Sequence, residues 1–321
     1  MNVLVLSELD DTQLSDLSTL LARCEQFDGH PALAEPQRAA AARRDLGAEG
    51  AYAVLAYERH SLAGCAFITP ATDGATALHV AIDPLHRGDV EPVAGTPGDT
   101  ESIKTALIRI ALGHVPEVHA AHDTVRLWLM QATAGDDADA ARLGFTPERD
   151  LLQMRVPLPL PTQIVASARP VVTRPFEPGR DDEAWLDVNN RAFADHPEQG
   201  GWTLADLHER TSAEWFDPEA FLMVDNEDGT GLLGSCWNKV HRDSTPVMGE
   251  IYVISVDPAR HGGGWGRALT VAGLQWIAAQ GITVGMLYTT SSNTPAVALY
   301  TSLGFTVDHV DRSYVLPGPV S

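Results

Sequence analysis

Residues Gly249–Gly266, with the sequence G-E-I-Y-V-I-S-V-D-P-A-R-H-G-G-G-W-G, decide how the second half of this chain folds. The apolar, β-branched run Ile251–Val256 predicts a buried strand, which Asp257-Pro258 ends. A glycine-dense turn follows, and then an apolar helix over Arg267–Ala279. Together these elements place several unpaired backbone N–H groups around one point, where the helix dipole also favours negative charge. The stretch therefore predicts a site for a pyrophosphate.

Three short motifs recur in the same order in both halves of the chain. They are Leu62-Ala63-Gly64-Cys65 with Leu232-Leu233-Gly234-Ser235, Asp83-Pro84 with Asp257-Pro258, and Leu143-Gly144-Phe145-Thr146 with Leu303-Gly304-Phe305-Thr306. The separations are 170, 174 and 160 residues, close to half of the 321-residue length. Two copies of one structural unit explain this order better than coincidence.

The repetition predicts an α/β fold of the α+β type, with two tandem domains that each have a mixed, mostly antiparallel central sheet flanked by helices. We expect a first domain over residues 1–157, a proline-rich linker over 158–169 and a second domain over 170–321. The elements expected in the second domain are Asp182–Ala194, Leu204–Thr211, Phe221–Asp225, Gly231–Val240, Gly249–Val256, Arg267–Ala279, Val284–Tyr288, Pro295–Leu303 and Phe305–Val315.

The first copy differs from the second where the glycine turn should stand. Its segment Gly88–Thr100 reads G-D-V-E-P-V-A-G-T-P-G-D-T, with two prolines, several acids and no G-x-G leading into a helix. Such a segment is unsuited to phosphate binding, because prolines lack a backbone N–H and acidic side chains repel phosphate. We expect a degenerate cofactor loop in the first domain, which would brace the second copy and wall one side of the substrate cleft.

The charge balance limits the possible partners. Lys and Arg number 22 against 43 Asp and Glu, so the formal net charge is −21. Such a surface repels nucleic acid and anionic membranes, and we expect neither as a partner. An anionic cofactor would need strong local donors, whereas a substrate that carries an ammonium group would be attracted.

The remaining bulk properties fit a monomeric protein of the cytoplasm. No apolar stretch approaches the length that spans a bilayer, and the N-terminus lacks the pattern of a signal peptide. The three cysteines, Cys24, Cys65 and Cys236, are far apart and form no C-x-x-C. We therefore expect neither a disulfide framework nor a zinc site, and no spacing of His196 and His241 supports another metal.

The motifs of the second half resemble the GNAT superfamily of acetyl-CoA-dependent N-acetyltransferases. The glycine turn fits the acyl-CoA signature of that family as His261-x-x-Gly264-x-Gly266, although arginine or glutamine is usual where His261 stands. The strand Val284–Tyr288, the helix that begins at Pro295 and the following L-G-F complete the likeness. The resemblance covers nearly all of residues 170–321 and rests on only a few markers over residues 1–150.

The segments Asn189–Trp202, Glu214–Pro218 and Trp237–His241 (W-N-K-V-H) more closely resemble one family of tandem GNAT enzymes. That resemblance implies acetyl-CoA as co-substrate and a small thiol precursor, cysteinyl-glucosaminyl-inositol, as the amine that is acetylated. The implied acetyl-CoA-binding residues are Ile254, Ser255, Val256, His261, Gly262, Gly263, Gly264, Trp265, Gly266, Arg267, Asn293, Thr294, Pro295, Ala296, Val297 and Ala298. The implied substrate-binding residues are Glu35, Glu198, Lys239, Glu250 and Tyr288. Trp202 and Trp237 are the aromatic residues that we would place near a sugar.

Acetyl transfer to an amine requires a neutral nucleophile, a polarised thioester carbonyl and a donor for the departing thiolate. Glu250, at the start of the central strand, is the candidate base, acting directly or through water. Tyr300, five residues before Phe305, is the candidate acid for the sulfur of CoA. Backbone N–H groups near Ile254–Val256 would polarise the carbonyl, and no covalent acyl-enzyme is needed.

Two other functions agree with the same motifs. The protein could acetylate another small amine or a peptide N-terminus. It could also be an acyl-CoA sensor without turnover, although a sensor would have no use for both Glu250 and Tyr300.

Overall fold

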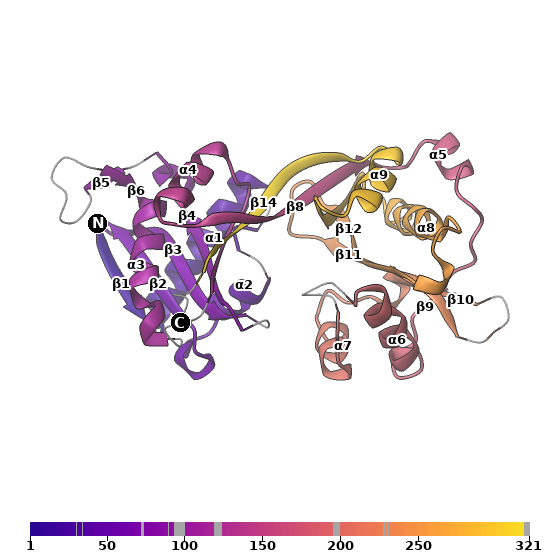
Figure 1. Cartoon of the computed structure of the whole chain (residues 1–321), viewed down its shortest axis with the longest axis horizontal. Coiled ribbons are helices and arrows are strands. Elements are labelled where there is room, and N and C mark those ends of the chain that lie inside the picture. The colour runs from indigo at the N-terminus through magenta and orange to yellow at the C-terminus, as the bar shows by residue number, and fades with distance from the viewer. Residues whose placement is uncertain are drawn as a thin grey trace. The chain divides into compact units, whose positions relative to one another are not determined.

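The structure is a computed structural model of the chain, and it describes residues 1–29, 31–33, 35–71, 74–88, 90–92, 100–118, 124–194, 200–226, 229 and 231–317. The chain forms two compact units (Figure 1). Unit 1 consists of Met1–Leu151 and His309–Ser321, and unit 2 consists of Leu152–Asp308.

Unit 1 contains a mixed sheet with the strand order β1-β2-β3-β4-β7-β14. Strands β4 and β7 are parallel, and the other neighbours are antiparallel. The elements are β1 (Asn2–Leu6), α1 (Asp11–Asp28), α2 (Glu35–Ala41), β2 (Tyr52–Glu58), β3 (Ser61–Pro70), β4 (Thr76–Ile82), the short pair β5 (Val90–Pro92) and β6 (Thr100–Ser102), α3 (Ile103–Val118), β7 (Val125–Leu129), α4 (Ala134–Arg142), and parts of β8 (Thr146–Pro157) and β14 (Thr306–Leu316).

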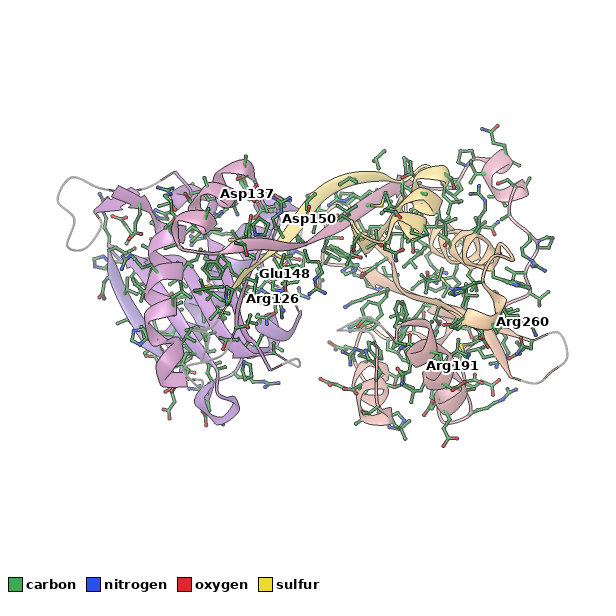
Figure 2. All side chains as sticks on the ribbon, viewed as in Figure 1. Arg126, Asp137, Glu148, Asp150, Arg191 and Arg260 are labelled. Carbon is green, nitrogen blue, oxygen red and sulfur yellow. The ribbon has the colours of Figure 1, made fainter. Side chains whose placement is uncertain are left out.

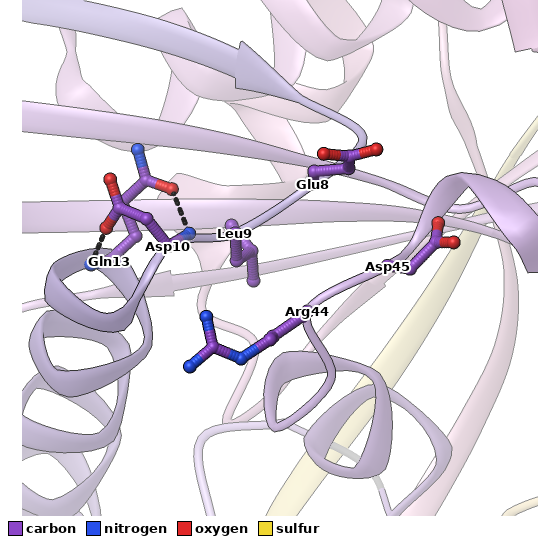
Figure 3. Close-up of a pocket in the computed structure, with 6 residues that line it drawn as sticks. All are labelled: Glu8, Leu9, Asp10, Gln13, Arg44 and Asp45. Carbon is purple, nitrogen blue, oxygen red and sulfur yellow. Dashed lines mark hydrogen bonds between the residues drawn. The ribbon is translucent and has the colours of Figure 1, made fainter.

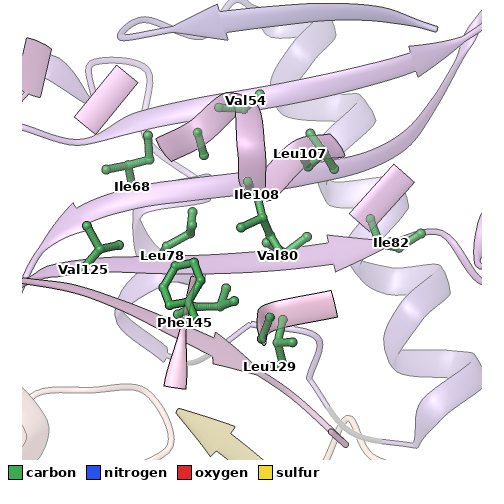
Figure 4. Close-up of a cluster of buried hydrophobic side chains, with 14 of the residues drawn as sticks. Val54, Ile68, Leu78, Val80, Ile82, Leu107, Ile108, Val125, Leu129 and Phe145 are labelled. Carbon is green, nitrogen blue, oxygen red and sulfur yellow. The ribbon is translucent and has the colours of Figure 1, made fainter. Parts of the chain in front are cut away.

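Helices cover both faces of the sheet in unit 1. On one face, Leu107 and Ile108 of α3 pack in a cluster with Val54 and Leu78 (Figure 4). On the other face, α1 packs in a second cluster that includes Phe67 of β3. Each fully buried side chain of this size stabilises the fold by roughly 1.5–3 kcal/mol, so the alternation along the strands fixes which face meets which helix.

In unit 2 the strand order is β8-β13-β12-β11-β10-β9, again with mixed strand directions. Strands β12 and β13 are parallel, and the ladders from β9 to β12 are antiparallel. Besides part of β8 and of β14, the elements are α5 (Thr162–Ala166), β9 (Arg174–Pro175), α6 (Asp182–Ala192), α7 (Leu204–Thr211), β10 (Phe221–Asp225), β11 (Leu232–His241), β12 (Met248–Val256), α8 (Trp265–Ala279), β13 (Val284–Thr290) and α9 (Thr294–Ser302).

Each face of the sheet in unit 2 also carries helices. Helices α8 and α9 share one core cluster with Ile251 of β12, and α6 and α7 share another with Trp237 of β11. Helix α8 approaches β12 closely at Gly249, where an added Cβ would lie 2.2 Å from Cγ2 of Ile277. Glycine at this position therefore allows the helix to pack against the strand that carries Glu250.

The two units repeat the same backbone details, which confirms the tandem organisation and the predicted fold class. The N–H of Asp83 donates to the carbonyl of Ala63 at 2.9 Å, and the N–H of Asp257 donates to that of Leu233 at 2.8 Å. A 3-10 turn follows each aspartate, over Pro84–His86 and Pro258–Arg260.

The bounds of the compact units differ from those of the predicted domains, because the C-terminal strand completes the sheet of unit 1. In β14, the segment Arg312–Leu316 pairs with β7 in antiparallel register. Unit 2 begins at Leu152, within β8, rather than after the linker. The L-G-F-T motifs mark where a strand begins, whereas the partner of that strand is decided by contacts distant in sequence.

An ion-pair network holds β14 within unit 1, and Figure 2 labels four of its residues, Arg126, Asp137, Glu148 and Asp150. The guanidinium of Arg312 donates to Asp150 at 2.6 Å and to Asp137 at 2.7 Å. Arg126 of β7 donates to Glu148 of β8 at 2.6 Å. The hydrogen bonds from Arg312 and Arg126 lower the pKa of Asp137 and of Glu148, respectively, below the ordinary carboxyl range.

The predicted linker is not an exposed tether. Leu158 and Leu160 are buried in the same core cluster as α8, and the N–H of Leu158 donates to the carbonyl of Thr283 at 2.8 Å. The prolines keep this segment extended, so alternate leucines point toward the core of unit 2. The segment continues into α5, which the sequence did not predict.

The predicted elements of the second half are all present, with small differences at their ends. Helix α8 begins at Trp265, two residues earlier than predicted, because Gly264 ends the turn in the left-handed region with φ of +76°. Helix α6 ends at Ala192 rather than Ala194. Over the described ranges, none of the helices has the length and apolar character that a membrane span requires.

Candidate functional site

Strands β12 and β13 separate at the centre of unit 2. Both strands are described in full, and their parallel ladder ends at the pair Ile251 and Leu287. Strand β12 nevertheless continues to Val256, paired with β11 on its other side. On the side of Ile254–Val256 that faces away from β11, the backbone groups are therefore not paired with β13. The predicted binding of pantetheine to this strand end needs such an edge.

Ser255 can offer only its backbone to a ligand on this edge. Its side chain is 2% exposed, and its Oγ lies 3.1 Å from Oγ of Ser235. Ser235 in turn accepts a hydrogen bond from the indole nitrogen of Trp185 at 2.9 Å. This buried chain fixes α6 against β11 and β12.

The predicted glycine turn leads directly into α8. Gly262 and Gly264 have φ of +81° and +76°, values that residues other than glycine rarely adopt. The first backbone bond of the helix runs from the N–H of Ala268 to the carbonyl of Gly264 at 3.1 Å. The N–H groups of Trp265–Arg267 precede this bond and point out of the helix end, where an anion is favoured.

Two arginines organise this turn. Arg267 donates to Oγ of Ser302 and to Oγ of Ser167, each at 2.7 Å, so its side chain connects α8 to α9 and to the end of α5. Arg169, which the sequence analysis missed, donates to the carbonyl of Gly263 at 3.0 Å. The Arg169 guanidinium also lies 3.4 Å from the ring centroid of Trp265, within the range of a cation–π contact.

Helix α9 begins beside the predicted cofactor residues Asn293–Ala298. Asn293 is the N-cap, and its side-chain oxygen accepts a hydrogen bond from the N–H of Ala296 at 3.2 Å. Pro295 stands in the first turn, where its missing N–H has no cost. The side chain of Asn293 thus serves the helix, and the other cofactor-binding assignments in this helix stay predictions.

One face of the sheet gathers three of the predicted substrate residues. Glu250 pairs with Lys239 across β11 and with Met286 across β13. Side chains at paired positions point to the same face, as do residues two apart on a strand. Glu250, Lys239 and Tyr288 therefore share one face. His241, two residues beyond Lys239, lies on it as well.

The carboxylate of Glu250 is hydrogen-bonded to His241, a partner that sequence reasoning did not identify. The distance from Nε2 of His241 to Oε2 of Glu250 is 2.7 Å. The Glu250 side chain is 10% exposed and the His241 side chain is 23% exposed. The segment Trp237–His241 contained the signal, because continuing the expected strand Gly231–Val240 by one residue places His241 on the same face as Lys239.

Lys239 is buried among aromatic rings. Its Nζ lies 4.2 Å from the ring centroid of Trp215 and 5.3 Å from that of Tyr252. Rings at these distances stabilise an ammonium group through their quadrupoles. Tyr288 is half-buried, and its hydroxyl accepts a hydrogen bond from Nε2 of Gln153 at 2.6 Å.

Tyr300 lies on α9 in the cluster that contains α8. The residue is 7% exposed, and its ring centroid is 5.7 Å from that of Phe305. Burial, with a smaller contribution from Cys236, raises the pKa of Tyr300 to about 12. Within the described residues its hydroxyl has no hydrogen-bond partner, so it is protonated and can donate to a ligand.

Two of the predicted substrate contacts are not placed. Glu198 lies outside the described residues, and so does the side chain of Glu35, whose backbone begins α2. Most of the segment Gly88–Thr100 also lies outside them, so the predicted degenerate loop of the first copy stays a prediction.

Trp237 does not lie beside a sugar site, contrary to the expectation. Its side chain is fully buried, and its ring stacks on Phe221 with centroids 4.4 Å apart. Trp202 is 9% exposed and contacts Arg210, whose guanidinium is 4.1 Å from the ring centroid. The sequence could not separate a core tryptophan from one that lines a cleft, because residue type alone does not report how deeply a ring is buried.

Unit 1 lacks the candidate catalytic pair of unit 2. Ala77 occupies the place of Glu250, because its partners on β3 and β7 correspond to those of Glu250 on β11 and β13. Ala140 stands five residues before the L-G-F phenylalanine, as Tyr300 does in the second copy.

A cavity of about 470 Å³ lies in unit 1, near the start of α1 (Figure 3). It is lined by Glu8, Leu9, Asp10, Gln13, Arg44 and Asp45, none of which was a predicted site residue. Asp10 and Gln13 hydrogen-bond each other's backbone as a capping box at α1. In the part of the chain that the structure describes, no three metal-ligating side chains cluster.

The chain matches known acetyltransferases in sequence and in fold. Residues 183–305 match the model of the acetyltransferase (GNAT) family. A solved GCN5-related N-acetyltransferase from Sphaerobacter thermophilus has a TM-score of 0.68 at 20% identity, covering 98% of this chain and 95% of that one. A tandem GNAT protein from the clavulanic acid biosynthesis pathway has a TM-score of 0.69 at 13% identity, covering 100% and 99%. The fold and the matched family model are thus those of the GNAT acetyltransferases, a class that uses acetyl-CoA.

Closer relatives narrow this class. The mycothiol acetyltransferase of Thermomonospora curvata is 41% identical over 97% of this chain and 96% of its own length. That of Kocuria rhizophila is 38% identical over 93% and 94%. The chain therefore belongs to the mycothiol acetyltransferase family.

Proposed function

We propose that this enzyme transfers the acetyl group of acetyl-CoA to the cysteine amine of cysteinyl-glucosaminyl-inositol, the last step in the synthesis of mycothiol. The name that its relatives share supports the product. The observation that carries the chemistry is the buried carboxylate of Glu250 on the same face as Lys239 and Tyr288, beside the point where β12 and β13 separate.

Acetyl-CoA would lie along the free edge of Ile254–Val256. Backbone groups of that edge can pair with the pantetheine amides, and one N–H there can polarise the thioester carbonyl. The N–H groups of the turn His261–Arg267 would bind the pyrophosphate, which needs such concentrated donors in a chain with a net charge of −21. The first residues of α9 would flank the cofactor.

Glu250 would act as the base. An α-amine in a reference peptide has a pKa near 7.7–8.0, so a modest shift in its equilibrium gives the neutral nucleophile. A carboxylate held within a mostly buried face is suited to take the proton that the nitrogen loses as the new bond forms. Lys239 and Tyr288 would orient the hydroxyl-rich part of the acceptor.

Tyr300 would serve the leaving group. As the C–S bond breaks, negative charge develops on sulfur, and the protonated hydroxyl of Tyr300 can stabilise it. We infer that unit 1 has no turnover of its own, because Ala77 and Ala140 stand where the second copy has Glu250 and Tyr300.

The test is to incubate the enzyme with acetyl-CoA and the cysteinyl precursor and to measure CoA and the acetylated product by chromatography and mass spectrometry. Glu250→Gln should remove most activity and retain acetyl-CoA affinity, whereas the exposed Glu183→Gln on α6 should change neither. Product formation near the wild-type rate in Glu250→Gln would reject Glu250 as the base. Another amine that outcompetes the precursor would reject the proposed substrate, and tight CoA binding without turnover would indicate a sensor.

A further inference from the structure

The hydrogen bond between His241 and Glu250 joins a buried group to one that reaches solvent. Within the described residues, His241 is the only side chain hydrogen-bonded to the Glu250 carboxylate, at 2.7 Å. The exposed fraction is 10% for the Glu250 side chain and 23% for the His241 side chain. The imidazole therefore lies between the carboxylate and water.

The position of His241 is fixed by the end of the β11–β12 hairpin. His241 is the last residue of β11 and pairs with Met248. Its carbonyl accepts a hydrogen bond from Oγ of Ser244 at 2.8 Å, and the same Oγ donates to the carbonyl of Pro246 at 2.9 Å. This closed turn fixes the backbone of His241, and the hydrogen bond to Glu250 orients its ring.

The charged and titratable neighbours on this face are few. Lys239 lies across the ladder from Glu250, and its ammonium contacts the rings of Trp215 and Tyr252. Tyr288 lies on the same face of β13, with its hydroxyl bound to Gln153. Arg242 and Asp243 follow in the turn and are exposed. Among the described residues, Glu250 is the only hydrogen-bond partner of the His241 ring, so the imidazole is the route from the carboxylate to solvent.

We propose that His241 relays to solvent the proton that Glu250 takes from the acceptor amine, an inference that rests on the proposed function. The bond between the amine nitrogen and the acetyl carbon forms, and the C–S bond breaks with its electron pair on sulfur. The nitrogen loses one proton to Glu250. The imidazole, whose Nε2–H donates to the carboxylate at rest, exchanges protons with solvent to the tautomer protonated at Nδ1, and the proton of Glu250 then passes from Oε2 to Nε2 of His241. The imidazolium then loses a proton to water, and the sulfur takes one from solvent.

A buried base needs such a route, because it must lose its proton before the next turnover. Imidazole gains and loses protons close to neutral pH, which makes it an effective carrier between a carboxyl group and water. His241 does not touch the reacting atoms in this scheme. It is a positioning and proton-relay residue that acts through Glu250.

The experiment compares His241→Ala and His241→Gln with the wild-type enzyme. Gln retains an N–H that can reach Glu250 but cannot carry a proton through its side chain. We expect both variants to lower kcat by about 100-fold or more, since a lost proton-transfer group costs about 10²- to 10⁴-fold, with the KM of the amine and the Kd of acetyl-CoA within about twofold. Added free imidazole should restore part of the rate of His241→Ala and none of that of Glu250→Gln.

A matched control is available in the same unit. His208 of α7 is bonded to the carboxylate of Asp182, with Nε2 2.8 Å from Oδ2, and His208→Ala should leave kcat unchanged and unresponsive to imidazole. Thermal melting of each variant reports whether it folds.

The outcomes separate the relay from the proposed function. Full activity in His241→Gln would show that the ring only positions Glu250, and would overturn the relay. The relay would also be overturned if His241→Ala had wild-type activity, or if its kcat were lowered and added imidazole did not restore part of it. In each of these cases an inactive Glu250→Gln leaves the proposed base intact. Absence of acetylation by the wild-type enzyme would instead reject the proposed function itself.

Discussion

Replacing Tyr300 with phenylalanine removes one hydroxyl and leaves the rest of the packing in place. The ring is 7% exposed and lies 5.7 Å from Phe305, contacts that phenylalanine retains. Burial raises the pKa of Tyr300 to about 12, so the hydroxyl stays protonated across the pH range of an assay.

The size of the effect follows from that pKa. A free thiol has a pKa near 8.5, so complete proton transfer from a hydroxyl at about 12 to a thiolate is uphill by about 3 to 4 pKa units, or about 5 kcal/mol. Tyr300 therefore stabilises the leaving sulfur as a hydrogen-bond donor. Loss of one such donor costs about 2.7–4 kcal/mol, and we expect Tyr300→Phe to lower kcat by about 10²–10³-fold.

The assay measures kcat by product formation, the Kd of acetyl-CoA by calorimetry and stability by thermal melting. We expect the Kd to change by less than about twofold, because the lost donor acts mainly on charge that develops in the transition state. Tyr57→Phe, which removes a hydroxyl bonded to Asp16 at 2.9 Å in unit 1, is the control and should leave kcat unchanged. A kcat of Tyr300→Phe within about threefold of wild type would refute the reasoning. The reasoning would also be refuted if wild-type activity fell with an apparent pKa below 10 and Tyr300→Phe abolished that fall.

Three further substitutions test the scaffold. Gly249→Ala should destabilise unit 2 by about 1–3 kcal/mol in urea denaturation, because its Cβ would overlap Ile277. Adding Ile277→Ala to this variant should relieve the overlap. If the losses of the two single variants were additive in the double variant, the overlap would be excluded as the cause. Arg169→Ala should weaken CoA binding in calorimetry about fivefold by loosening the glycine turn, and an unchanged Kd would contradict this role. The hydrogen bond from Arg191 lowers the pKa of Asp257. The stability that this ion pair adds is therefore present above the ordinary carboxyl pKa, and it is lost as the pH falls through the lower pKa of the folded state. Because Arg191 is partly exposed, Arg191→Ala should cost less than about 1 kcal/mol at pH 7 and progressively less as the pH falls below the ordinary carboxyl range, and a loss that does not change with pH would exclude the ion pair as the cause.

The sequence predicted the local parts of the site well. The run Gly249–Gly266 contains its own strand, turn and helix start, because β-branched residues, glycines with positive φ and an apolar helix each act over a few neighbours. The same reasoning placed Glu250 on the central strand and Tyr300 on the helix before L-G-F. The motif order also revealed the two copies.

Contacts distant along the chain lay beyond that reasoning. The sequence did not reveal that β14 completes the sheet of unit 1, that Leu158 and Leu160 enter the core of unit 2, or that Trp237 is buried. Each depends on which surfaces meet after folding, and one sequence offers many apolar surfaces of similar strength.

By itself, the sequence determined the tandem α/β architecture, the phosphate-type turn and the carboxylate on the central strand, because these follow from periodicity and turn chemistry over short spans. Only the tertiary structure decided that His241 meets Glu250, that Arg169 braces the turn and which strand closes each sheet. Strand register and helix packing bring such residues together, and both are fixed by the burial of side chains far apart in the chain.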